Sequence, residues 1–153
     1  MKCQYYEGRA CEFRGANSLT TSFELNDSRL TFRCQGKLDP ASLLTAFREC
    51  LRIAVESGAT QLLFDCREVI GVPTFTQRFE MGTKAAELFH ARGSSTPLAA
   101  AMLVRSDFLD PNRFGQTVAR NRGLTGITTD CEEEAIRFLE TGEMPEGAPD
   151  APS

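Results

Sequence analysis

The chain has 153 residues, of which 41% are apolar and 25% are charged, as in an ordinary globular protein. A domain of this length buries about two-thirds of the surface that its unfolded chain exposes. This composition argues against global disorder or a fibrous repeat, and no apolar run approaches the ~20 residues that span a bilayer.

The charge is unevenly distributed along the chain. The formal net charge is −4, yet from Asp130 onward eight acidic residues stand against Arg137 alone. We interpret this end as the solvated face of a last helix followed by a flexible acidic tail, residues 141–153. The dispersed basic excess before it does not indicate nucleic-acid binding. No apolar core of a signal peptide follows Met1-Lys2, so we expect a cytoplasmic protein.

The residue types that usually carry chemistry are sparse or badly spaced. The six cysteines include no C-x-x-C pair, and His90 is the one histidine, so we expect neither a metal site nor a cofactor. Without an export signal, buried free thiols fit better than disulfides. The sequence has no Gly-rich phosphate loop and no nucleophile-elbow motif, and we expect a non-enzymatic protein without catalytic residues.

The first part of the chain predicts an arm and then a hairpin. Residues 1–18 form the arm, either as two short strands or as a segment lying on the domain, which we place at residues 19–140. Apolar and polar residues alternate over 19–25 and again over 29–34, around the turn residues Asn26-Asp27-Ser28. This pattern predicts an antiparallel β-hairpin. Asp39-Pro40 then starts a helix that ends at Gly58.

The central stretch predicts a strand, a loop and a helix. The apolar run Gln61–Asp65 ends in an acid, residues 66–73 form a loop, and a helix follows from Thr74 to Arg92, with Gly93 as its stop. Thr74 and Gln77 stand three apart, which predicts a capping box. In open α/β sheets, ligands or partners bind at such a junction between strand end and helix start.

The remaining elements complete an alternating pattern. Residues 98–104 predict a buried strand, Asp110-Pro111 starts a helix, 127–129 form a short strand, and Asp130 with Glu133 predicts a second capping box. The fold class is therefore α/β, with a mainly parallel sheet, an N-terminal antiparallel hairpin at or near one edge, and four helices.

This order resembles the STAS superfamily, the fold of bacterial anti-sigma factor antagonists and of sulfate-transporter cytoplasmic domains. Asp65 matches the strand-end aspartate of phospho-regulated members, and Thr74 falls on their phosphorylatable hydroxyl position. Pro73 replaces the aspartate that precedes that hydroxyl, and the glycine after it is missing. Residues 76–80 and 118–123, with the acidic run into Ala135, are similar to stand-alone, uncharacterised SpoIIAA-like bacterial proteins. The resemblance implies a regulatory interaction module.

The candidate binding residues gather around the junction at Thr74 and at the end of the third helix. They are Asp65, Val72, Thr74, Phe75, Thr76, Arg78, Arg120 and Arg122. Thr74 is either a phosphorylation site or a plain helix cap, and the two arginines either contact a partner or only complement a helix dipole. If the protein docks a partner, the surface over residues 69–79 should carry an exposed apolar patch.

Two alternatives stay open at this point. The domain is either a protein-interaction module or a carrier of a small apolar or anionic molecule such as a lipid. The strand at 19–25 lacks the lysines and prolines that protect a sheet edge, so the arm pairs along it or a second copy of the chain does, as a homodimer.

Overall fold

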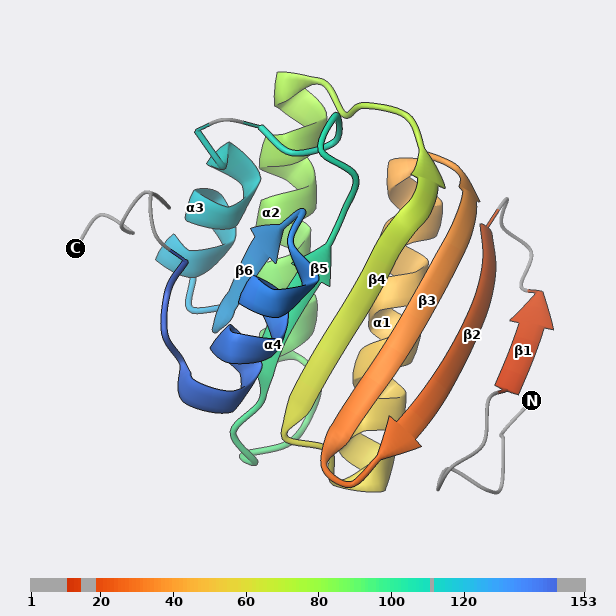
Figure 1. Cartoon of the computed structure of the whole chain (residues 1–153), viewed down its shortest axis with the longest axis vertical. Helices are drawn as coiled ribbons and strands as arrows, with labels where there is room; N and C mark the ends of the chain where they lie inside the picture. The colour runs from red at the N-terminus through yellow and green to blue at the C-terminus, as the bar shows by residue number, and fades with distance from the viewer. Residues whose placement is uncertain (1–10, 15–18, 111, 146–153) are drawn as a thin grey trace.

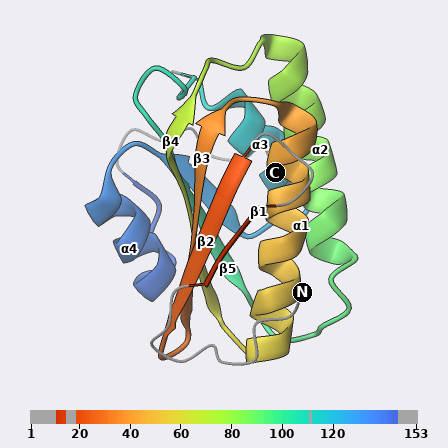
Figure 2. The same ribbon diagram turned by 90° about the vertical axis from the view of Figure 1, so that its right-hand side faces the viewer.

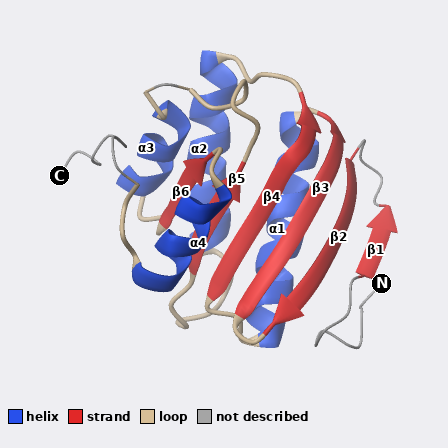
Figure 3. Cartoon of the chain, in the orientation of Figure 1, coloured by secondary structure: helices blue, strands red, loops and turns tan. Residues whose placement is uncertain are grey.

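The structure is a computed structural model, and it describes residues 11–14, 19–110 and 112–145. Six strands and four helices follow one another in this part of the chain (Figures 1 and 3). The strands are β1 Cys11–Arg14, β2 Leu19–Asn26, β3 Arg29–Lys37, β4 Gln61–Ile70, β5 Ala99–Leu103 and β6 Gly126–Thr129. The helices are α1 Pro40–Ser57, α2 Phe75–His90, α3 Phe114–Asn121 and α4 Glu132–Thr141.

The strands form one sheet whose spatial order is the chain order, β1 to β6. β1, β2 and β3 pair antiparallel, whereas β3 to β6 are parallel, since a helix connects each of these strands to the next. The predicted fold class is therefore confirmed, with the hairpin β2–β3 near one edge. β1 comes from the predicted arm and pairs along β2; residues 1–10 and 15–18 of that arm lie outside the described residues.

The helices cover the two faces of the sheet unequally. α1, α2 and α3 lie on one face, and α4 lies on the other (Figure 2). α4 packs on β4, β5 and β6 and adds an ion pair between Glu140 and Arg29 of β3, so most of the outer face of β2 and β3 is left open (Figure 1). Within the described part of the chain, no helix is long and apolar enough to cross a membrane.

A row of phenylalanines forms the centre of the core. The strand register sets Phe23, Phe32 and Phe64 side by side on β2, β3 and β4, with ring centroids 6.4 and 6.0 Å apart. Phe47 of α1 meets the edge of the Phe64 ring at 5.5 Å. This row packs α1 onto the sheet, because all four rings are buried.

β4 continues beyond the predicted strand end. Asp65 was expected to terminate it, but β4 runs on to Ile70, and that prediction is wrong. After a bulge in β3, the last residues of β3 pair with Glu68, Val69 and Ile70, and the amide of Leu38 donates to the Ile70 carbonyl at 2.9 Å. This long-range pairing satisfies the backbone hydrogen-bonding groups at the end of β4. From the sequence alone, the charged pair Arg67-Glu68 indicates a loop there.

Two helix starts also differ from the prediction. α3 begins at Phe114, not at Asp110-Pro111, and the Asp110 carboxylate accepts hydrogen bonds from the Phe114 and Asn112 amides instead. The N-cap of α4 is Cys131, and the capping box of Asp130 and Glu133 is not formed. Asp130 accepts from the Ser106 hydroxyl at 2.8 Å, so it fastens the β5–α3 loop.

Candidate functional site

The N-terminus of α2 has the capping box that the sequence predicts. Thr74 is its extended N-cap residue. The Thr74 hydroxyl accepts from the Gln77 amide at 3.1 Å, and the Gln77 side-chain oxygen accepts from the Thr74 amide at 2.9 Å. These bonds satisfy two backbone donors that a helix start otherwise leaves free. The Thr74 side chain is exposed, so the cap lies at the surface.

Replacing Thr74 by alanine removes this cap. We expect Thr74→Ala to lower the free energy of unfolding by about 1 kcal/mol, and Thr74→Ser to restore most of it. Thr76→Ala is the matched control, because Thr76 is exposed on the same turn without a capping role. Urea denaturation measures the difference; equal losses for Thr74→Ala and Thr76→Ala would show that the cap does not stabilise α2.

Large apolar side chains are exposed around this helix start. Phe75 is 67% and Phe79 42% exposed, and Ile70 and Val72 at the end of β4 and in the following loop are more than half exposed. Phe114 of α3 stacks on Phe75 at a centroid distance of 4.4 Å and lies 6.3 Å from Phe79. We call Ile70, Val72, Phe75, Phe79 and Phe114 the aromatic patch. The apolar patch expected over residues 69–79 is therefore present.

The aromatic patch extends the core-facing stripe of α2. Phe75 and Phe79 lie on the same helical face as the buried Gly82, Ala86 and Phe89, as their spacing predicts. The first turns of α2 rise beyond the carboxyl ends of the strands (Figure 1), so this part of the stripe has no sheet beneath it. Among the described residues, Phe114 is the only aromatic ring that stacks on Phe75 and Phe79.

The predicted arginines have separate roles. The Arg122 guanidinium lies over the Phe79 ring, 5.4 Å from its centroid, and so joins the aromatic patch. Arg120 donates to the Gly126 carbonyl at 2.9 Å, and Arg78 donates to the Phe108 carbonyl at 2.8 Å. These two arginines thus tie α3 to β6 and α2 to the β5–α3 loop. Thr76 and Val72 are exposed beside Phe75, as expected of surface residues.

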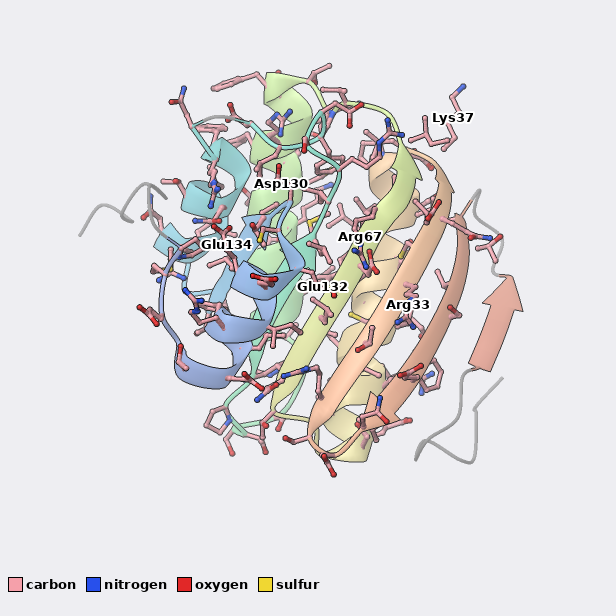
Figure 4. The ribbon with its side chains drawn as sticks, viewed as in Figure 1. Arg33, Lys37, Arg67, Asp130, Glu132 and Glu134 are labelled. Carbon is pink, nitrogen blue, oxygen red and sulfur yellow. The ribbon has the colours of Figure 1, made fainter. Side chains whose placement is uncertain are left out.

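Asp65 does not share a site with Thr74. Its side chain points to the sheet face that α4 covers, whereas Thr74 starts a helix on the opposite face (Figure 2). The buried Asp65 carboxylate accepts from the Arg67 side chain at 2.9 and 3.1 Å, and Arg67 also donates to Glu132 of α4 at 3.0 Å. Arg33, Arg67 and Glu132 all lie on the same side of the sheet as α4 (Figure 4). Burial raises the pKa of Asp65, but the bonds from Arg67 outweigh it and hold the pKa below its usual value.

This lowered pKa predicts a pH-dependent contribution of Asp65 to stability. A carboxyl group with a lower pKa in the folded state stabilises at pH values above its unfolded pKa of about 4, and the gain is lost as the pH falls through the folded pKa. We expect Asp65→Asn to lower the free energy of unfolding by about 1–2 kcal/mol at pH 7 and by almost nothing near pH 2. The value at pH 7 is modest because Arg67 is exposed, so solvent screens the ion pair.

Asp107→Asn is the control for this series, since Asp107 pairs with Arg105 in an exposed ion pair. Denaturant titrations at several pH values give the two differences. A cost of Asp65→Asn that does not change with pH would contradict the ion-pair explanation.

The thiol after Asp65 is buried. Cys66 is fully buried, and burial, followed by the neighbouring Cys34, raises its pKa well above the ordinary value. Cys34, Cys50, Cys66 and Cys131 are free thiols, and no group of three or more metal-ligating side chains occurs among the described residues.

A cavity of about 130 Å³ lies between the sheet and the layer formed by α1, α2 and α3. Its walls are mainly apolar, but Arg113 and Gln116 of the α3 region line it too. Of the residues that line this cavity, the sequence reasoning named only Arg78 as a binding residue, and it did not include Phe114 in the apolar patch. One feature of the sequence points to Gln116: it stands three residues before Ala119, so a polar side chain lies on an apolar helical face.

No protein-family model matches the sequence, and a comparison with curated proteins gives no match either. Among solved structures, an anti-sigma factor antagonist from Mycobacterium paratuberculosis is similar, with a TM-score of 0.54 and 14% sequence identity. The match covers 84% of this chain and 99% of that chain. At this identity the match shows the fold alone: the chain shares the fold of this anti-sigma factor antagonist, as the sequence predicts.

Proposed function

We propose that this chain is a non-enzymatic regulatory module that binds a partner protein through the aromatic patch. The observation that supports this role most is the exposure of Phe75 and Phe79 on a helix whose start is fixed by a capping box. Grouped aromatic side chains at a surface are costly to leave in water, and they are the usual anchors of protein interfaces. A cytoplasmic location goes with this role.

The protein of similar fold supports the class of partner. It is an anti-sigma factor antagonist, and an interaction with another regulatory protein is the role that we carry over to this chain. The aromatic patch is apolar with Arg122 at Phe79, so the partner surface that fits it is apolar with an acidic residue at its rim.

Thr74 is the proposed switch of this surface. A phosphate on its exposed hydroxyl adds about −1.5 to −2 charges beside the α2 amides and next to Phe75. That charge would favour the helix start but oppose an apolar partner. Mass spectrometry of protein purified from its own cells tests this point, with Thr76 as the internal control. Phosphate on Thr76, or on neither threonine under any growth condition, would exclude the switch without excluding the docking surface.

The docking proposal is tested by truncating one patch residue. We expect Phe75→Ala to weaken partner capture by about thirtyfold or more. Truncating a central interface residue commonly costs about 2 kcal/mol of binding free energy, which corresponds to this factor. Val55→Ala is the matched control, because Val55 is an exposed apolar residue on α1, outside the aromatic patch. Equal capture by the two variants would contradict the proposal.

A homodimer through the same patch is the competing explanation. Light scattering of the wild type and of Phe75→Ala separates the two, since a patch that pairs two copies gives a dimer that the variant converts to monomer. A wild-type monomer supports a different partner protein. A dimer lost in Phe75→Ala would replace the proposal by self-association.

The second candidate function, a small-molecule carrier, is favoured by the cavity under the helices. Pockets for drug-sized ligands measure about 300–1,000 Å³, so a cavity of this size is too small for a lipid acyl chain. A small anionic molecule is the ligand class that the cavity still supports, because Arg113 and Gln116 lie in its wall.

A further inference from the structure

The cavity under the three helices exists because small residues meet there. Gly82 and Ala85 of α2, Ala100 of β5, and Gly115 and Ala119 of α3 all line it. The larger apolar side chains around this space are aliphatic, aromatic and sulfur-containing, and they include Phe47, Phe64, Met81, Met102 and Phe108. An engineered cavity of about 150 Å³ with apolar walls binds benzene, so this space suits a group of one aromatic ring.

Gln116 brings an unused hydrogen-bond donor to this apolar space. Its side chain is 5% exposed, and its Oε1 accepts from the Thr128 amide at 2.7 Å, which fixes the orientation of the side-chain amide. The Nε2 group is buried and has no hydrogen-bond partner among the described residues. A buried donor left unpaired is unfavourable, and an acceptor from a ligand would remove that cost.

Arg113 adds a positive charge at the same place. It stands one turn before Gln116, lines the cavity, and has a buried Nη1 without a partner among the described residues. Its backbone is left-handed, with φ of 49°. A non-glycine residue in this conformation is strained, and such strain is concentrated at functional sites.

The charges that line the cavity favour an anion. Arg78 and Arg113 are positive and Asp110 is negative. The Asp110 carboxylate already accepts from the Phe114 and Asn112 amides, whereas Arg113 retains a free donor. An acceptor with one negative charge would therefore balance the lining and satisfy both unused donors.

We infer that this cavity binds a small apolar monocarboxylate of about the size of benzoate. Its ring lies among the apolar walls, and its carboxylate accepts from Gln116 Nε2 and Arg113 Nη1. No residue of the aromatic patch lines this cavity, so the test of the cavity is independent of partner docking.

Titration calorimetry of the full chain with benzoate and with toluene tests the inference. We expect benzoate to saturate one site and to bind at least tenfold tighter than toluene, since a charged hydrogen bond contributes about 1.5–3 kcal/mol and 1.4 kcal/mol corresponds to a factor of ten. Absence of benzoate binding would overturn the inference. So would binding of toluene as tight as that of benzoate, because the cavity would then be a plain apolar void.

Two variants locate the site. Gln116→Glu keeps the acceptor for the Thr128 amide but places a carboxylate beside Arg113, so we expect it to abolish benzoate binding. Ala119→Leu should fill the cavity and block both probes without lowering the melting temperature. Gln35→Met, a change of an exposed glutamine on β3, is the control and should bind as the wild type does. Unchanged benzoate binding by either cavity variant would place the ligand elsewhere and overturn the inference.

Discussion

Phe32→Ala is expected to lower the free energy of unfolding by about 3–5 kcal/mol, the usual cost of removing a buried phenylalanine from a core. Phe32 is fully buried, and its ring lies between those of Phe23 and Phe64 on the neighbouring strands. The truncation would therefore open a cavity in the middle of the row that joins the hairpin β2–β3 to β4.

Phe79→Ala is the control for this truncation, since the same atoms are removed from a side chain that is 42% exposed. We expect it to cost less, about 1–2 kcal/mol, because a large part of the Phe79 surface stays in water on folding. Chemical denaturation of both variants gives the comparison. Similar costs for Phe32→Ala and Phe79→Ala would contradict the strand register that sets the three rings side by side.

Gly82→Ala is the second large effect, and it acts on the contact between α2 and α3. A Cβ atom on Gly82 would lie 2.7 Å from the Gly115 carbonyl oxygen and 3.1 Å from Val118. Alanine favours a helix over glycine by about 1 kcal/mol, but overpacking of a close helix contact costs about 1–3 kcal/mol. Since the oxygen belongs to the backbone of α3, the clash is relieved only by moving that helix, and we expect net destabilisation.

Gly115→Ala is the matched change on the facing helix. Its Cβ would lie 3.5 Å from the Arg78 carbonyl oxygen and 3.8 Å from the Arg78 Cβ, both ordinary contacts. We expect a melting temperature equal to that of the wild type or higher, because the helix propensity then acts alone. A Gly82→Ala variant that is as stable as Gly115→Ala would show that the two helices are not packed this closely.

The sequence predicted those elements whose signals are local. The alternation over residues 19–25 reflects one buried face, and the structure shows it as β2; the pair Thr74 and Gln77 needs only its own backbone to form a capping box. The extension of β4 to Ile70 has no local signal, because it depends on pairing with β3 beyond a bulge. Asp130 was misassigned for the same reason, since its partner Ser106 lies 24 residues away along the chain.

The candidate site also combines features that the local sequence predicts with features that it does not. Phe75 and Phe79 follow from helical spacing, but their exposure follows from how far α2 extends past the sheet, which spacing does not encode. Phe114 lies on another helix, is half-buried and stacks on Phe75 in the aromatic patch. The cavity depends on small residues from several elements that meet in space, so no single stretch of sequence predicts it.

The docking role is tested most directly by photo-crosslinking from inside the aromatic patch. A photoreactive phenylalanine analogue at position 75, in the full chain and in the cells that make the protein, should form a covalent adduct with one distinct protein. The same analogue at position 55 should give no such adduct. Adducts of equal yield from both positions, or an adduct only with a second copy of this chain, would contradict the proposed partner surface.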